Sequence, residues 1–336
     1  MSVRHIFLFL FSVLAVAATA EEPRGVLRDP VAWLQRASDQ MNLRMPGSAP
    51  FHMKVSFQAL PGIELNKKPQ ILSGQGSYEE IWVSPKQWRR EVSLGSYHAV
   101  EVAYNGQRKF QASSDFEPGR VLMLLEALLN PVPRNYLSPE LNDIPLAWKI
   151  EDHAADKTPY VRIGRSIMGM QHSFVSSYTF LPSGLLVLSN EAGLVTGRQD
   201  DIVFAGKVVA RRITVQAGGQ EVLAADVVVE AADKIDPETF DIPGAPASPG
   251  RTMRPLHFYE TSKLSLSVDF SILGSSPTAS AIRQVIDRHG VPRETELLTG
   301  ESKDGSAALM DGLRRASGHP AKIDNDPCET VIYGYY

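Results

Sequence analysis

Short β-prone segments joined by turn residues fill most of residues 51–230, and this pattern constrains the fold more than any other feature. Asn105-Gly106 is typical of a two-residue hairpin turn, and Pro182-Ser183-Gly184 is a second tight connection. Because consecutive strands with short connections pair side by side, the sequence predicts a long antiparallel meander. The expected strands cover residues 51–60, 72–83, 87–93, 97–104, 107–113, 160–164, 173–181, 185–191, 194–204, 207–216 and 221–230.

Two helices are expected to accompany these strands. Asp29 followed by Pro30 is a helix start, and apolar residues then recur at helical spacing up to Asn42. A second helix covers residues 118–129 and is apolar on most sides, so the rest of the protein must enclose it. The predicted fold is therefore mainly β with α, an α+β protein.

The first residues predict export. Arg4 and His5 precede an apolar run over residues 6–17, and Ala18-Thr19-Ala20 is a small-residue cleavage pattern. The run is shorter than the roughly 20 residues that span a bilayer, so no stable membrane anchor is expected. Residues 1–20 are predicted to be a signal peptide and the mature protein to be soluble in the periplasm, with retention of the peptide as an anchor left open.

Composition and spacing argue against several classes of function. The 336 residues carry 34 Lys plus Arg against 38 Asp plus Glu, a formal net charge of -4, so no basic surface for nucleic acid is expected. The eight histidines form no close ligand set, and Cys328 is the only cysteine. No Gly-x-Ser-x-Gly elbow occurs. The sequence predicts a protein that is not an enzyme and has neither a metal nor another cofactor.

A Pro- and Gly-rich stretch divides the chain. Residues 244–255 are expected to be a linker between a domain at 21–243 and a smaller one at 256–336. Beyond the linker, residues 264–272 alternate between apolar and polar, as in a half-buried strand.

The larger domain resembles the periplasmic lipoprotein carrier and sorting proteins of the LolA and LolB type. The residues that carry this resemblance are 76–78, Trp82 and 88–89 in the first group of strands, and 178–187, Phe240 and Pro243 after them. The resemblance implies an antiparallel half-barrel with covering helices that holds an acyl chain or a lipoprotein. Six residues would then line the cavity: Trp82, Trp88, Phe110, Met123, Leu124 and Leu128. The alternative is that the same side chains form a filled core.

The smaller domain resembles a degenerate TonB C-terminal domain. Val285, Asp287 and Gly290 match the spacing that opens that family's domain, and Gly290 suits a hairpin turn. Residues 320–327 match the connection before its last strand, with Asn325 where the family has Gly. The family's Trp and Phe are replaced by Ala316 and Gly318.

This second resemblance implies a small β-β-α-β domain with a helix at residues 306–316 and a last strand at 329–336. It also implies that the last strand accepts an added strand from an envelope protein, through Val331, Ile332, Tyr333 and Tyr335. An ordinary structural strand is the alternative.

Together these features predict a noncatalytic periplasmic envelope protein that binds or senses a lipid or lipoprotein and docks a protein partner through its C-terminal domain. The second hypothesis is a protein-interaction component of a TonB-type transport system with no lipid ligand.

Overall fold

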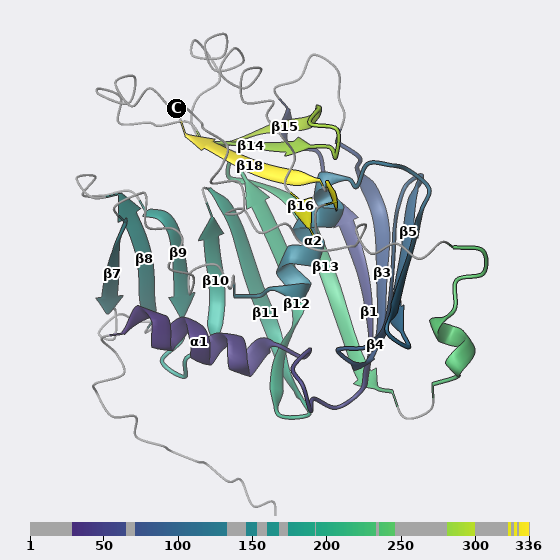
Figure 1. Cartoon of the computed structure of the whole chain (residues 1–336). Coiled ribbons are helices and arrows are strands. Elements are labelled where there is room, and N and C mark those ends of the chain that lie inside the picture. Colours follow the sequence, from purple (N-terminus) through teal and green to yellow (C-terminus); the bar gives the residue numbers. More distant parts are fainter. Residues whose placement is uncertain are drawn as a thin grey trace, which may run out of the picture.

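A twelve-stranded antiparallel sheet dominates the computed structural model, and two α-helices lie against it (Figure 1). The structure describes residues 29–64, 71–132, 146–152, 160–167, 174–191, 193–232, 235–245, 281–299, 322–323, 326–327 and 329–335. The expected signal peptide, the helix at 306–316 and the strand at 264–272 lie outside these residues, as do all but two residues of the expected linker. The mainly β fold predicted from the sequence is confirmed for the described residues.

The large sheet consists of two meanders joined by a long-range pairing. Val55 in β1 lies opposite Tyr78 of β3 on one side and opposite Val227 of β13 on the other. In spatial order the strands are β6 (Gln107–Ala112), β5 (Tyr97–Tyr104), β4 (Gln87–Leu94), β3 (Gly74–Ser84), β1 (Phe51–Ala59), β13 (Gln220–Ala231), β12 (Lys207–Ala217), β11 (Leu194–Phe204), β10 (Leu186–Glu191), β9 (Phe174–Phe180), β8 (Val161–Ile167) and β7 (Leu146–Asp152). The sequence patterns predict eleven of these strands but miss β7.

Helix α1 (Pro30–Met41) crosses the sheet near β8, β9 and β10 (Figure 1). Its start is fixed as the sequence predicts, because the Asp29 carboxylate accepts a hydrogen bond from the Val31 amide at 2.9 Å. Trp33 and Leu34 are buried, and the Trp33 ring packs on Phe180 with centroids 5.3 Å apart. This cluster covers one half of the sheet.

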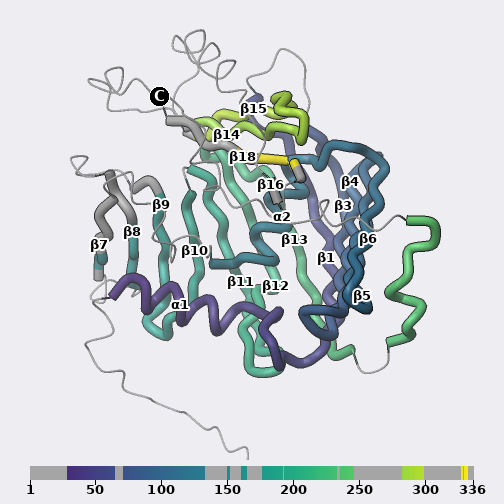
Figure 2. The backbone as a smooth tube through the Cα atoms, in the orientation of Figure 1, coloured from purple at the N-terminus to yellow at the C-terminus, as the bar shows by residue number. Residues whose placement is uncertain are grey.

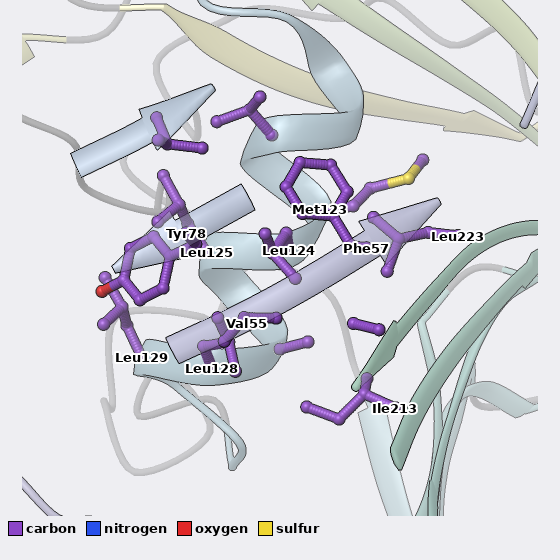
Figure 3. Packing of buried hydrophobic residues seen from close by; sticks show 14 of the residues in the cluster. Val55, Phe57, Tyr78, Met123, Leu124, Leu125, Leu128, Leu129, Ile213 and Leu223 are labelled. Carbon is purple, nitrogen blue, oxygen red and sulfur yellow. The ribbon is translucent and has the colours of Figure 1, made fainter. Parts of the chain in front are cut away.

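Helix α2 (Gly119–Leu129) covers the other half and is buried at every position except Glu126. Its side chains pack against alternate residues of β1, which places Val55 and Phe57 beneath the helix, and against Leu223 of β13 (Figure 3). Within the described residues, no helix is both long and apolar enough to cross a membrane.

A second sheet lies over the amino end of α2 (Figures 1 and 2). Its strands follow the order β18 (Thr330–Tyr335), β14 (Ala281–Ile286), β15 (Pro292–Thr299) and β2 (Ile63–Glu64), so the tail pairs with a strand from the first part of the chain. We call its three C-terminal strands, β14, β15 and β18, the tail sheet. A short ribbon, β16 (Lys322–Ile323) with β17 (Asp326–Pro327), accompanies it.

The hairpin between β14 and β15 has the turn that the sequence predicts. Gly290 has a φ of 82°, where glycine is favoured, and its amide donates to the Asp287 carbonyl at 2.9 Å. The Asp287 carboxylate also accepts from the amides of His289 and Val291.

A short 3₁₀ helix, η4 (Pro237–Phe240), follows the large sheet. Phe240 packs with Val100 and Val102, and its ring stacks on Tyr104 with centroids 5.5 Å apart. This contact fastens the end of the larger region to the outer strands of the sheet.

Candidate functional site

Helix α2 and its surroundings form the candidate site, because the six predicted lining residues meet here. All six are buried in one cluster, three on strands and three on α2. Figure 3 shows the three on α2, which are Met123, Leu124 and Leu128. Trp82 of β3 lies opposite Trp88 of β4 and stacks on Phe51, with ring centroids 5.6 Å apart. Trp82, Trp88, Phe110, Met123, Leu124 and Leu128 therefore share one packed region of the molecule.

The predicted docking strand is β18, and its placement is described less completely. Val331 is buried in the tail sheet. Ile332, Tyr333 and Tyr335 lie in the same strand, and their side chains lie outside what the structure describes. Among the described strands, β18 is an edge strand with β14 on one side.

A small cavity of about 20 Å³ lies beside the carboxyl-terminal half of α2, which is room for about one water molecule. Met123 and Ala127 give it an apolar wall, and Glu126, Glu191 and Arg198 give it a charged one. The remaining lining residues are Asn130, Pro131, Ser189, Leu194, Thr196 and Val215. The cavity therefore borders the apolar core, since Met123, Ala127, Leu194 and Val215 belong to both, and its charged wall makes it a small polar chamber.

The sequence reasoning missed the polar chamber. Glu126 is an acidic residue inside an otherwise apolar helical run, and this was the available signal, because a carboxyl group on an enclosed helix needs polar neighbours. The sequence does not identify the neighbours, since Glu191 and Arg198 come from strands more than sixty residues away.

Arg198 is buried and donates from one nitrogen to Ser189 Oγ at 3.2 Å and from another to the Pro131 carbonyl at 3.0 Å. Burial lowers the pKa of Arg198 to about 10. The negative charges of Tyr178, Asp201 and Glu126 raise this pKa, but burial has the larger effect. Tyr178 donates a short hydrogen bond to Glu191. Hydrogen bonds from Arg198 and Tyr178 thus connect the charged wall of the chamber to the surrounding strands and to Pro131.

Burial raises the pKa of Glu126 to about 8, and the nearby charge of Glu191 adds to this increase. Arg283 and Arg198 act in the opposite direction. Glu126 is therefore largely protonated at neutral pH while α2 is in place.

Replacing Glu126 with Gln is expected to stabilise the protein in alkaline solution. Between pH 4.5 and 8 the unfolded chain loses a proton that folded Glu126 retains, so the wild type loses stability across this window as pH rises. The variant has no such proton, and its advantage should grow to about 2 to 4 kcal/mol above pH 8. Urea unfolding at pH 5, 7 and 9 measures this difference, with the exposed Glu221→Gln as control. If the free energy of unfolding depends on pH in the same way in the wild type and in Glu126→Gln, the raised pKa of Glu126 is contradicted.

The carboxyl end of α2 is tied to β3 by a buried cluster of charges. Arg44 Nη1 donates to the Leu128 carbonyl at 3.0 Å, and its Nε donates to both oxygens of Glu80 at 3.0 Å. Arg90 Nε donates to the same carboxylate at 2.9 Å, as does the Tyr78 hydroxyl at 3.0 Å. Burial raises the pKa of Glu80, but the charges of Arg44 and Arg90 outweigh it and lower the pKa to about 2.

No metal site is apparent in the part of the chain that the structure describes, because no three His, Cys, Asp or Glu residues are grouped suitably there. The candidate site thus consists of the apolar helix α2 packed on an apolar face of the sheet. Charged side chains contact both ends of the helix.

No family model matches the chain, and no curated protein matches it. Among solved structures, the chain is similar to a LolA superfamily protein from Nitrosomonas europaea. The two are 11% identical, the match covers 63% of this chain and 97% of that protein, and the TM-score is 0.30. This similarity concerns the first of the two families that the sequence resembles, and the TonB resemblance of residues 256–336 stays a prediction.

Proposed function

We propose that this chain is a noncatalytic protein of the bacterial envelope, exported to the periplasm, that binds an acyl chain or a lipoprotein beneath α2. The observation that carries the proposal is the setting of α2, an apolar helix that lies on an apolar sheet face and is held at its ends by polar groups. Lifting such a helix would uncover a continuous apolar surface. The charged start and apolar run of residues 1–20 support export.

Binding in this proposal requires α2 to move, because the closed cavity holds only about one water molecule. The acyl chain would take the place of the helix side chains on Val55, Phe57 and Leu223. A chain that buries twelve methylene groups gains roughly 10 kcal/mol, which offsets a large part of the cost of exposing the helix. The ligand class follows from this matching of apolar surfaces.

Native mass spectrometry of protein purified from envelopes tests the proposal, together with titration by a dansyl-labelled undecanoic acid. We expect co-purifying lipid and a saturable fluorescence increase at micromolar protein. Absence of both signals from folded protein would overturn lipid binding.

We also propose that the outer edge of β18 docks a protein partner. Support comes from the position of β18 at the edge of its sheet among the described strands, where backbone groups can pair with an added strand. This proposal is independent of the lipid site.

Proline substitution at two neighbouring residues distinguishes the two edges of β18. Successive amides of a strand point to opposite sides, so one of Ile332 and Tyr333 directs its N–H toward β14 and the other directs it outward. We expect Pro at one position to disturb the fold and Pro at the other to leave circular dichroism unchanged while abolishing capture of the partner. Pull-down from envelope extract with the full chain is the measurement, and capture that survives in the variant that stays folded would contradict docking at this edge.

A further inference from the structure

We propose that the tail sheet is a latch that holds α2 in the half-barrel and that release of this latch opens the acyl-chain site. The inference rests on the proposed function for the ligand, but the latch itself rests on contacts at the amino end of α2. Three independent contacts join the tail sheet to this end of the helix and to the strand beside it.

The first contact is a buried ion pair. Arg120 of α2 donates to both oxygens of Glu296 in β15, from Nη1 at 2.8 Å and from Nη2 at 2.7 Å. The two side chains are 0% and 1% exposed. The Arg120 Nε donates to the Leu60 carbonyl at 3.0 Å. Such a two-pronged pair is strong and directional, and loss of one partner leaves a charge in an apolar surrounding.

The second contact supplies the cap that α2 lacks in its own sequence. Pro118 precedes the helix and offers no side-chain hydrogen bond, and the first turn contains no acidic residue. The Glu294 carboxylate of β15 instead accepts from the Gly119 amide at 3.0 and 3.1 Å. Arg283 of β14 donates to the Gly119 carbonyl at 3.3 Å. The tail sheet therefore provides the hydrogen-bond acceptor that the start of the helix lacks in its own sequence.

Two glycines permit this close approach. A Cβ atom on Gly119 would lie 2.0 Å from Glu294 Oε2, and a Cβ on Gly62 would lie 1.7 Å from Glu296 Oε1. Neither glycine has the positive φ that would itself require glycine. Space for the two carboxylates explains both glycines better than backbone conformation does.

The third contact is between strands. Leu297 of β15 lies opposite Ile63 of β2, and the neighbouring Leu298 is fully buried in the same cluster as Leu124. The tail sheet is thus continuous with the core around α2.

Because of these contacts, α2 should stay packed on the large sheet only while the tail sheet is in place. Without Glu296, the Arg120 guanidinium would remain buried without the carboxylate that it pairs with, and without Glu294 the helix start would lose its cap. Movement of the amino end of α2 toward water would hydrate the Arg120 charge and the uncapped amides of the helix. We therefore expect the helix to move away from the large sheet when the tail sheet is displaced.

Hydrogen exchange of the full chain tests the latch without any lipid. Glu296→Gln keeps the size of the side chain and removes its charge. We expect exchange in residues 119–129 to become roughly ten-fold faster or more, with β1 and β3 unchanged. Glu230→Gln is the control, because it removes one carboxylate from the exposed pair with Lys54. The double variant Arg120→Met with Glu296→Leu replaces the pair by apolar side chains and should restore slow exchange.

Gly119→Ala gives a second and opposite test. Alanine favours a helix over glycine, so α2 alone should become better protected, whereas the latch predicts faster exchange because the new Cβ displaces Glu294. Glu296→Gln is the deciding variant if circular dichroism shows that it is folded. If it is not folded, Gly119→Ala is the deciding variant for the latch. Exchange of α2 within about two-fold of wild type in the deciding variant would overturn the latch.

Uptake of the dansyl-labelled acid by the same variants separates the latch from the function. Faster exchange of α2 with increased uptake supports both. Faster exchange with no uptake by any form overturns the acyl-chain site and leaves the latch. Uptake by the wild type with unchanged exchange in the deciding variant overturns the latch and leaves the function.

Discussion

Replacing Leu124 with Asp should abolish acyl-chain capture and lower the free energy of unfolding by about 3 to 5 kcal/mol. Leu124 is 0% exposed and lies at the centre of the cluster between α2 and the sheet (Figure 3). The variant loses the transfer energy of a buried leucine and adds a carboxyl group to an apolar site. Urea unfolding measures the stability, and titration with the dansyl-labelled acid measures capture on the fraction that remains folded.

Val203→Asp is the matched control, because it makes a similar apolar-to-acid change at a side chain that is 75% exposed. Its effect on stability should stay within about 0.5 kcal/mol, and capture should be unchanged. Wild-type stability in Leu124→Asp would mean that α2 does not pack on the sheet in solution.

Replacing Glu80 with Gln should cost about 3 to 5 kcal/mol at neutral pH. The amide retains the size of the side chain but leaves the largely buried Arg44 and Arg90 without the carboxylate that pairs with both of them. The change also loosens the carboxyl end of α2, because Arg44 holds the Leu128 carbonyl.

The dependence on pH identifies the charge as the cause. The pKa of Glu80 is lowered from about 4.5 to about 2, so its stabilising effect is complete above pH 4.5 and is lost as pH falls toward 2. The difference between wild type and Glu80→Gln should therefore shrink across this window in urea titrations.

Glu91→Gln on the adjacent strand is the control, because Glu91 pairs with Arg89 at a half-exposed position. It should cost no more than about 1 kcal/mol. A similar loss in both variants would show that burial of the Glu80 charges contributes little.

Local patterns predicted much of this fold. Asn105 and Gly106 both have positive φ, as the predicted hairpin turn requires, and Asp29 caps α1 as expected. These features depend on neighbours within a few residues, which a sequence displays directly. The burial of α2 also followed from its apolar composition.

Long-range partners could not be predicted in the same way. Arg120 is a charge in an apolar helix and so requires a partner, but Glu296 is 176 positions away and many carboxylates compete for that role. The polar chamber around Glu126 was missed for the same reason, because Glu191 and Arg198 are also distant in the sequence. The proposed division at residues 244–255 reflects composition, whereas the pairing of β15 with β2 depends on tertiary contact and leaves no local pattern.

The place of β1 in the large sheet has a consequence for how the chain folds if it is exported as proposed. β1 pairs with β3 soon after it is made, but its other neighbour, β13, comes much later; Lys54 and the Glu230 that pairs with it are 176 positions apart. A chain crossing a membrane amino end first would expose the free edge of β1, a strand that contains Phe51 and Phe57, until β13 arrives. Such an edge is open to wrong strand pairing and slows folding, so efficient export would require a chaperone that shields extended apolar segments.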